Sequence, residues 1–192
     1  MRRSNSEDLF GTPVLPGFVS ADTFVSRDEE QALIAAIDAT NLSPFRFQGW
    51  TGKRLTSSFG YDYDFDACRL QSAEPLPTWL LPIRERAARF AGLAPDTLVQ
   101  ALLIRYDPGA GIGWHRDRPA FEHVVGISLG APATMRFRRR RGERFERVSA
   151  PLHPRGIYRL SGEARHEWEH SICEMDEPRW SITLRSMRGA AD

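Results

Sequence analysis

Two histidines and an aspartate in the second half of the chain have the side-chain types and spacing of a metal site. His115 and Asp117 lie two residues apart, and His170 follows later in the chain. Two imidazoles and one carboxylate can cap one face of an octahedral Fe(II) ion and leave the opposite positions open, an arrangement typical of oxygenases. Because residues i and i+2 of a strand point the same way, His115 and Asp117 could reach one ion if their segment is extended.

A third ligand has to come from another strand, and His170 is the first candidate. His166 lies an even number of residues before it, so it could share the same sheet face and complete an alternative triad. An H-x-D pair alone more often marks a surface turn than a metal site. The metal interpretation therefore needs support from another part of the chain.

The segment 179–185, R-W-S-I-T-L-R, reads as a strand with two different faces. With a period of two, one face carries Arg179, Ser181, Thr183 and Arg185, and the other carries Trp180, Ile182 and Leu184. Guanidinium groups bind carboxylates through paired, charge-assisted hydrogen bonds, so the polar face suits a dicarboxylate. The alternative is a solvated edge of a half-buried sheet. Because the segment spans roughly 20 Å, the two arginines must lean together or bind different groups, and Arg179 is the preferred carboxylate ligand.

The elements that must position these residues can be read from composition and periodicity. The chain has 192 residues, 41% of them hydrophobic, and five tryptophans, which is enough for one globular domain with its own core. Residues 1–12 read as a flexible tail, and residues 14–18 as a short strand. A capping-box start predicts a helix over 26–39, and a second helix is predicted over 78–90, ending at Gly92. After Leu98, short β-rich runs broken by Gly and Pro are typical of an antiparallel β core.

No membrane or export signal is visible in the sequence. The chain has no apolar run long enough to span a bilayer, and no signal-peptide stretch follows its first residues. Two cysteines provide no disulfide framework. We therefore expect a cytoplasmic monomer that makes no membrane contact.

Two segments combine basic residues with aromatic ones. Between the predicted helices, residues 45–65 interleave aromatics, bases and glycines, which would suit a pocket for an unstacked base or, equally, a β-hairpin with inward-facing rings. The run Arg136 to Arg144 predicts a basic hairpin that could neutralise phosphates or simply be solvated. Because the formal net charge is only +1, this hairpin is a local patch on a nearly neutral protein.

Taken together, these segments resemble the AlkB-like 2-oxoglutarate- and Fe(II)-dependent dioxygenases, from about Ala101 to Arg185. The resemblance is carried by R-Y-D-P-G-A at 105–110, H-R-D at 115–117, V-G-I-S-L-G at 125–130, S-G-E-A-R at 161–165 and the R-x-x-x-x-x-R strand. It implies a mainly β (α+β) fold, a double-stranded β-helix or jelly-roll core buttressed by N-terminal helices. Residues 13–192 would form a single domain, with helices and a substrate lid at 13–97 and the jelly-roll catalytic core at 98–188.

The same resemblance implies roles for individual residues. The Fe(II) ligands and catalytic centre would be His115, Asp117 and His170, with O2 as the oxidant. The cosubstrate 2-oxoglutarate would be bound at its distal carboxylate by Arg179 and near the metal by Arg185, with Tyr106 and Ser181 as further contacts. The lid would contact the substrate through Trp50, Arg54 and Tyr61.

The implied activity is oxidative dealkylation of N-alkylated DNA or RNA bases, a repair reaction that releases an aldehyde, succinate and CO2. Departures from the family pattern concern mainly the substrate. Ile104 and Ser181 replace asparagines found in many members, and Pro119 stands where well-known bacterial repair enzymes carry an acidic residue that contacts the base. Two alternatives therefore remain: an enzyme that hydroxylates or demethylates modified tRNA or a protein side chain, and a catalytically idle binding module.

Overall fold

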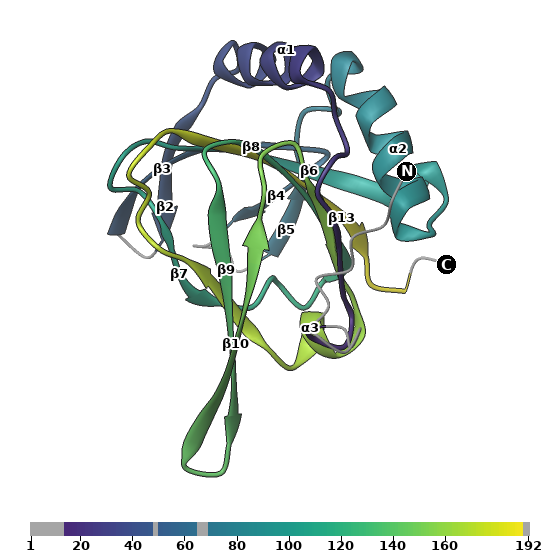
Figure 1. Cartoon of the computed structure of the whole chain (residues 1–192). Helices are drawn as coiled ribbons and strands as arrows, with labels where there is room; N and C mark the ends of the chain where they lie inside the picture. The colour runs from purple at the N-terminus through teal and green to yellow at the C-terminus, as the bar shows by residue number, and fades with distance from the viewer. Residues whose placement is uncertain (1–13, 48–49, 65–68, 190–192) are drawn as a thin grey trace.

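Most of the chain folds into two stacked β-sheets. The computed structural model describes residues 14–47, 50–64 and 69–189 (Figure 1). The larger sheet has the strand order β1 (Phe18–Ala21), β11 (Ile157–Leu160), β8 (Phe121–Gly130), β13 (Arg179–Met187), β6 (Leu98–Tyr106), β3 (Trp50–Phe59) and β2 (Ser43–Phe47). The smaller sheet has the order β10 (Arg144–Leu152), β9 (Ala133–Arg141), β12 (Glu169–Ile172) and β7 (Ile112–His115). A separate hairpin pairs β4 (Tyr61–Asp64) with β5 (Arg69–Ser72).

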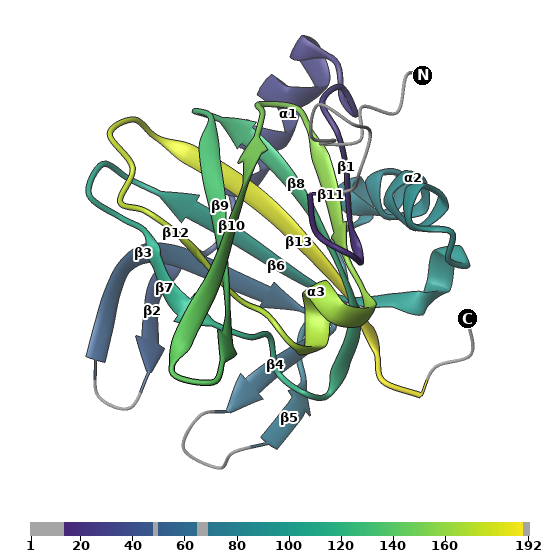
Figure 2. The ribbon, with the colours of Figure 1, turned by 60° about the horizontal axis from the view of Figure 1, so that its bottom comes forward.

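The smaller sheet lies across one face of the larger sheet, with an apolar layer between them (Figures 1 and 2). This layer combines Phe18, Val124 and Leu160 of the larger sheet with Met135 and Phe137 of the smaller one. The short helix α3 (Gly162–His166) follows β11 and adds the buried Ala164 to the same layer. The predicted mainly β, jelly-roll architecture is confirmed.

Two helices cover the opposite face of the larger sheet (Figure 1). They are α1 (Arg27–Asp38) and α2 (Leu81–Ala91), which follows the short turn η1 (Thr78–Leu80). Ser26 caps α1, since its hydroxyl accepts from the Glu29 amide while the Glu29 carboxylate accepts from the Ser26 amide, as predicted. Gly92 ends α2 in a left-handed conformation, with φ 73°. Both predicted helices are therefore confirmed.

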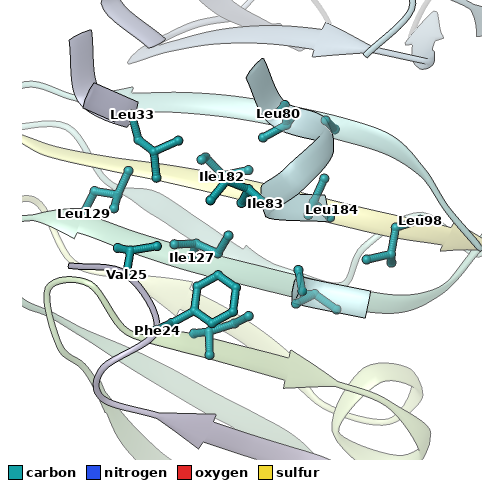
Figure 3. Packing of buried hydrophobic residues seen from close by; sticks show 14 of the residues in the cluster. Phe24, Val25, Leu33, Leu80, Ile83, Leu98, Ile127, Leu129, Ile182 and Leu184 are labelled. Carbon is teal, nitrogen blue, oxygen red and sulfur yellow. The ribbon is translucent and has the colours of Figure 1, made fainter. Parts of the chain in front are cut away.

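A second apolar cluster fills the space between these helices and the larger sheet. Figure 3 shows Leu33 of α1 and Ile83 of α2 packed over Ile127, Ile182 and Leu184 of the central strands. The short turn η2 (Pro95–Thr97) then leads the chain from the helices into β6. The larger sheet is consequently covered on both faces.

Strand β13 lies between β8 and β6 in the interior of the larger sheet. Its apolar side chains Ile182 and Leu184 pack toward the helices, while Arg179 and Ser181 are also buried. The alternative of a solvated sheet edge for this segment is therefore wrong. The polar face of β13 points into the space between the two sheets.

The first strand lies later in the chain than predicted. It was expected at residues 14–18 but begins at Phe18, because a turn precedes it and Gly17 has φ +85°. A Cβ atom at Gly17 would lie 2.0 Å from the Ser161 carbonyl oxygen, so only glycine allows this close approach to the start of α3. The predicted tail, residues 1–12, lies outside the described residues, and none of the described helices is long and apolar enough to cross a bilayer.

Candidate metal and cosubstrate site

The three predicted metal ligands lie together between the two sheets. His170 in β12 pairs directly with His115, the last residue of β7, and residues opposite each other in an antiparallel pair point to the same face. Their ring centroids are 4.3 Å apart. Asp117 follows the end of β7, and the ligand atoms of all three residues lie within 4.8 Å of one another. Among the described residues this is the only such cluster, and it could hold one metal ion.

The alternative triad with His166 is wrong. His166 lies in α3 rather than in a strand, and its Nε2 is 2.7 Å from the Glu122 Oε1. His166 is not among the residues whose ligand atoms cluster with His115. The even spacing of His166 and His170 has no structural meaning, because the chain between them leaves α3 before it enters β12.

Both imidazoles of the cluster are held in the neutral form. Burial lowers the pKa of His170 to about 3, and the adjacent His115 ring adds to the shift. Burial also lowers the pKa of His115, although the Asp117 carboxylate opposes this change. His115 Nδ1 lies 2.9 Å from the Gly113 carbonyl oxygen, and because a carbonyl only accepts, Nδ1 must donate. The His115 Nε2 therefore keeps the lone pair that a metal needs.

Asp117 is held as a carboxylate by Arg185. The Nε and Nη2 atoms of Arg185 lie 2.8 and 2.7 Å from Asp117 Oδ1, and Arg185 Nη1 donates to Gln100 Oε1 at 2.8 Å. Burial disfavours the charged form of Asp117, but the nearby cations, Arg185 foremost, more than offset it and hold its pKa well below the usual range. The other oxygen, Oδ2, lies 3.5 Å from His170 Nε2 and is the atom free to bind a metal.

Arg179, like Arg185, is a cation on the polar face of β13, but most of its N–H donors have no acceptor among the described residues. Its side chain is fully buried, and its Nε donates to the Ser128 hydroxyl at 3.2 Å. Neither Nη1 nor Nη2 has a hydrogen-bond partner among the described residues. The guanidinium carbon lies 5.0 Å from the centre of the Tyr106 ring, which faces Arg179 in the β13–β6 register. A buried cation with unpaired N–H groups is costly unless an anion binds there, so this site fits a carboxylate.

The remaining predicted cosubstrate contact, Ser181, is also buried on the polar face of β13. It lies opposite Ser128 of β8 and Ile104 of β6. The two arginines of the strand thus bind different groups, as their separation along β13 required. Arg185 pairs with the aspartate, and Arg179 is left for an added ligand.

Tyr158 belongs to the same interior surface, although no sequence pattern pointed to it. Its ring lies over Gly126 of β8, where a Cβ atom would be 2.1 Å from the Tyr158 Cζ. Burial raises the pKa of Tyr158 to about 12, with the charge of Arg179 opposing the change. The signal in the sequence is the glycine within V-G-I-S-L-G, but its meaning depends on the pairing of Tyr158 with Gly126.

The loop that follows Asp117 is held from inside the protein by Arg165. The Arg165 Nη2 donates to the carbonyl oxygens of Arg118 at 2.6 Å and Phe121 at 2.7 Å. Arg165 is 3% exposed and belongs to the S-G-E-A-R segment, to which the sequence analysis assigned no role. Its contacts indicate that it positions the metal-site loop.

Of the predicted substrate contacts, Arg54 lies within electrostatic range of Tyr106 and Arg185. It is 8% exposed, its guanidinium carbon lies 3.8 Å from the centre of the Phe45 ring, and its Nε has no partner among the described residues. Burial lowers the Arg54 pKa, with the Tyr106 hydroxyl opposing the shift and Arg185 adding to it. Tyr61 is half-buried in the β4–β5 hairpin, and the side chain of Trp50 lies outside the described residues.

Another aromatic residue of the same hairpin reaches the metal-site loop. The Arg118 guanidinium carbon lies 4.0 Å from the centre of the Tyr63 ring. Arg118 directly follows Asp117, so this contact joins the β4–β5 hairpin to the metal-site loop. Tyr63, which was not predicted, therefore borders the site in addition to the predicted Tyr61.

Comparison with known proteins gives independent information about this arrangement. Residues 23–189 match the family model described as the 2OG-Fe(II) oxygenase superfamily. An Arabidopsis thaliana protein named "Alkylated DNA repair protein ALKBH8 homolog" is 30% identical over 91% of this chain and 56% of its own length. A Xenopus tropicalis "tRNA (carboxymethyluridine(34)-5-O)-methyltransferase alkbh8" is 31% identical over 86% of this chain and 26% of its own length.

A solved structure shares the fold at low sequence identity. The structure of OsALKBH1 superposes with a TM-score of 0.69 at 14% identity, covering 88% of this chain and 96% of that one. At this identity the similarity establishes the fold alone. The chain spans only about half of the plant relative and about a quarter of the frog one.

Metal binding should depend on His170 and not on His166. We expect His170→Ala to weaken Co(II) binding by more than about tenfold, since it removes one of three protein ligands from a buried site. The matched variant His166→Ala should bind Co(II) as the wild type does, because His166 contacts Glu122 instead. Isothermal titration calorimetry on the two variants measures the difference. Loss of Co(II) binding in His166→Ala with retention in His170→Ala would reverse the ligand assignment.

Proposed function

Because the chain is an AlkB-like member of the 2OG-Fe(II) oxygenase superfamily, and so an oxidoreductase that uses Fe(II), 2-oxoglutarate and O2, we propose that it oxidatively dealkylates N-alkylated bases of nucleic acids. In this proposal the iron is held by His115, Asp117 and His170. Iron and 2-oxoglutarate together supply the oxidation of a substrate C–H bond by O2, with succinate and CO2 as coproducts. The protein residues bind and orient these groups and exclude water.

The observation that carries the proposal is that the two NH2 groups of Arg179 have no hydrogen-bond partner among the described residues. They lie in the same interior space as the three-ligand cluster, on the strand that also supplies Arg185. A dicarboxylate with one end at the metal and the other at Arg179 would provide the missing acceptors. Tyr106 and Ser181 line the same surface and would add hydrogen bonds, while Arg185 keeps Asp117 charged and oriented.

The proposed substrate follows from the groups that border the site. Arg54 with Phe45 and Arg118 with Tyr63 each join a guanidinium to an aromatic ring, and such pairs suit phosphates and unstacked bases. The name of the plant relative refers to repair of alkylated DNA. Hydroxylation of an N-alkyl carbon gives a hemiaminal, which collapses to release the aldehyde and restore the base.

A second candidate function is oxidation of a modified tRNA base. The name of the frog relative refers to a tRNA uridine, which favours this reading. Pro119 also lies two residues after Asp117, so the chain presents no carboxylate there to contact a base. The same iron chemistry would then leave a stable hydroxylated carbon instead of a lost alkyl group. Oxidation of a protein side chain is a third possibility for the same site.

Binding of 2-oxoglutarate should depend on Arg179. We expect Arg179→Gln to weaken 2-oxoglutarate binding to the metal-loaded protein by about 30-fold or more, because the buried carboxylate loses its charged partner. Metal affinity should remain that of the wild type. Calorimetric titration of 2-oxoglutarate into Co(II)-loaded protein measures the effect.

Arg105→Gln is the matched control for this titration. Arg105 pairs with Trp180 on the opposite face of the same sheet and is bonded to Asp107 at 2.8 Å, so its loss should leave 2-oxoglutarate affinity unchanged. Wild-type affinity in Arg179→Gln, in protein shown to be folded by circular dichroism, would remove Arg179 from the cosubstrate site.

The substrate class can be tested by succinate release with Fe(II) and 2-oxoglutarate. We expect the wild type to form succinate and formaldehyde in equal amounts on N-methylated single-stranded DNA or RNA, and His115→Ala to form neither. Duplex DNA, tRNA and protein extracts complete the panel. Turnover on tRNA with none on N-methylated DNA or RNA would favour the second candidate, and turnover only on protein would reject a nucleic-acid substrate.

A further inference from the structure

The basic run in β9 and β10 divides its charges between two faces of the hairpin. Because side chains alternate along a strand, Arg139 and Arg141 share one face of β9 while Arg136, Arg138 and Arg140 share the other. On the first face the positive charges are neutralised. Arg139 forms ion pairs with Glu146, Glu163 and Glu167 at 3.1, 2.8 and 2.7 Å, and Arg141 pairs with Glu146 at 2.9 Å.

On the second face, most of the arginines form no ion pair with a carboxylate among the described residues. We call this face the outer arginine strip, and it consists of Trp114 of β7, Arg136, Arg138 and Arg140 of β9, and Phe145 and Arg147 of β10. Phe137, between two of these arginines, is fully buried and pairs with His170, so the strip lies on the side of the smaller sheet that faces away from the metal site. Glu169 bonds Arg138 at 2.6 Å and is the only carboxylate within ion-pair distance of the strip among the described residues.

The arginines of the strip are stacked on its aromatic rings. The Arg138 guanidinium carbon lies 4.5 Å from the Trp114 ring centre and 4.8 Å from that of Phe145. Arg136 lies 5.1 Å from Trp114, and Arg147 lies 5.5 Å from Phe145. Phe145 is 37% exposed and is the one large hydrophobic side chain classed as exposed in the part of the chain that the structure describes. The strip thus presents flat rings and flat cations side by side on the surface.

We propose that the outer arginine strip binds a single-stranded stretch of nucleic acid that flanks the base in the active site. Guanidinium groups neutralise phosphates, and exposed rings stack on bases without regard to sequence, which is the usual combination in single-strand binding surfaces. The inference rests on the proposed function for its substrate class. An acidic protein would also be attracted by the charge, but it would not need the exposed Phe145 ring.

The position of the strip suits a flanking strand. Trp114 directly precedes His115, and β7 is an outer strand of the smaller sheet, so a nucleic acid could pass from the metal site around this edge. From β7 to β10 the strip crosses three strand spacings, about 15 Å. In Figure 2 the β9–β10, β2–β3 and β4–β5 hairpins all extend toward the lower part of the view, although Figure 1 shows that the β9–β10 hairpin alone projects beyond the rest of the molecule. Arg54 lies in β3 and Tyr63 in β4.

The test measures binding of an unmodified, labelled single-stranded RNA of about 16 nucleotides to metal-free protein by fluorescence anisotropy, over a series of NaCl concentrations. The double variant Arg140→Ala/Arg147→Ala should reduce the slope of log affinity against log salt by about 1.4, because two phosphate contacts are lost. Phe145→Ala should weaken binding by about tenfold with little change in slope. The matched control Arg141→Ala, on the neutralised face and 67% exposed, should change neither quantity.

Two results would overturn the proposal. The first is that the double variant and Phe145→Ala both bind RNA with the affinity and salt slope of the wild type. The second is that Arg141→Ala loses as much RNA affinity as these variants do, which would indicate a non-specific attraction of RNA to positive charge. If poly-glutamate displaces the RNA and Phe145→Ala binds both as the wild type does, the strip is a site for an acidic protein instead.

Turnover separates failure of the strip from failure of the proposed function. On a methylated trinucleotide, too short to reach the strip, all four proteins should release succinate at the same rate. On a long methylated single strand, the double variant and Phe145→Ala should show a raised KM with an unchanged kcat. If the wild type oxidises the long strand and the variants do so with the same KM and kcat, the proposed role of the strip is contradicted and the proposed function is not. If RNA affinity falls in the strip variants as expected but no nucleic acid is oxidised, the proposed function is contradicted and RNA binding by the strip is not.

Discussion

A buried guanidinium group whose two Nη atoms have no hydrogen-bond partner among the described residues is the constraint around which this structure is arranged. Arg179 sits in the central part of the larger sheet, between β8 and β6, and neither of its two NH2 groups has a hydrogen-bond partner among the described residues. Such a group is tolerated only where an anion completes it. The same strand places the half-buried Arg185 against Asp117, so the charge of Arg185 is already neutralised. Arg185, which is already paired, therefore marks the part of the site that holds the metal ligands. Arg179, whose NH2 groups are unpaired among the described residues, marks the part that would receive an added carboxylate.

The rest of the fold serves to keep this polar face dry and fixed. The opposite face of β13 is packed under α1 and α2 through Ile182 and Leu184, so the strand cannot shift without opening the main apolar cluster (Figure 3). The smaller sheet closes the other side and brings His115 and His170 into direct register. The two faces of this sheet carry different side chains, because Phe137 faces the metal site while Arg136 and Arg138 face outward. Because side chains alternate between the two faces of a strand, one sheet can contribute to the metal site on one face and to the proposed nucleic acid binding on the other.

Much of the site could be predicted from the sequence, because its main signals are local. The H-x-D pair and the two-faced strand 179–185 are visible in short segments. In the structure His115 and Asp117 lie beside His170, although Asp117 follows the end of β7, and residues 179–187 form an interior strand. What could not be predicted depends on pairing between distant strands. The choice between His166 and His170 needed the position of α3, and the contact between Tyr158 and Gly126 needed the β11–β8 register. The start of β1 was misplaced because the tight approach of Gly17 to Ser161 involves residues far apart in the chain.

The central claim is that Arg179 receives the distal carboxylate of 2-oxoglutarate while His115, Asp117 and His170 hold the metal. The most direct measurement is a crystal structure of the protein prepared without oxygen in the presence of Mn(II) and 2-oxoglutarate. The account predicts Mn(II) bound by those three side chains, and the distal carboxylate within hydrogen-bond distance of Arg179 Nη1 and Nη2. A distal carboxylate paired with Arg54 or Arg185, with Arg179 still unpartnered, would contradict it.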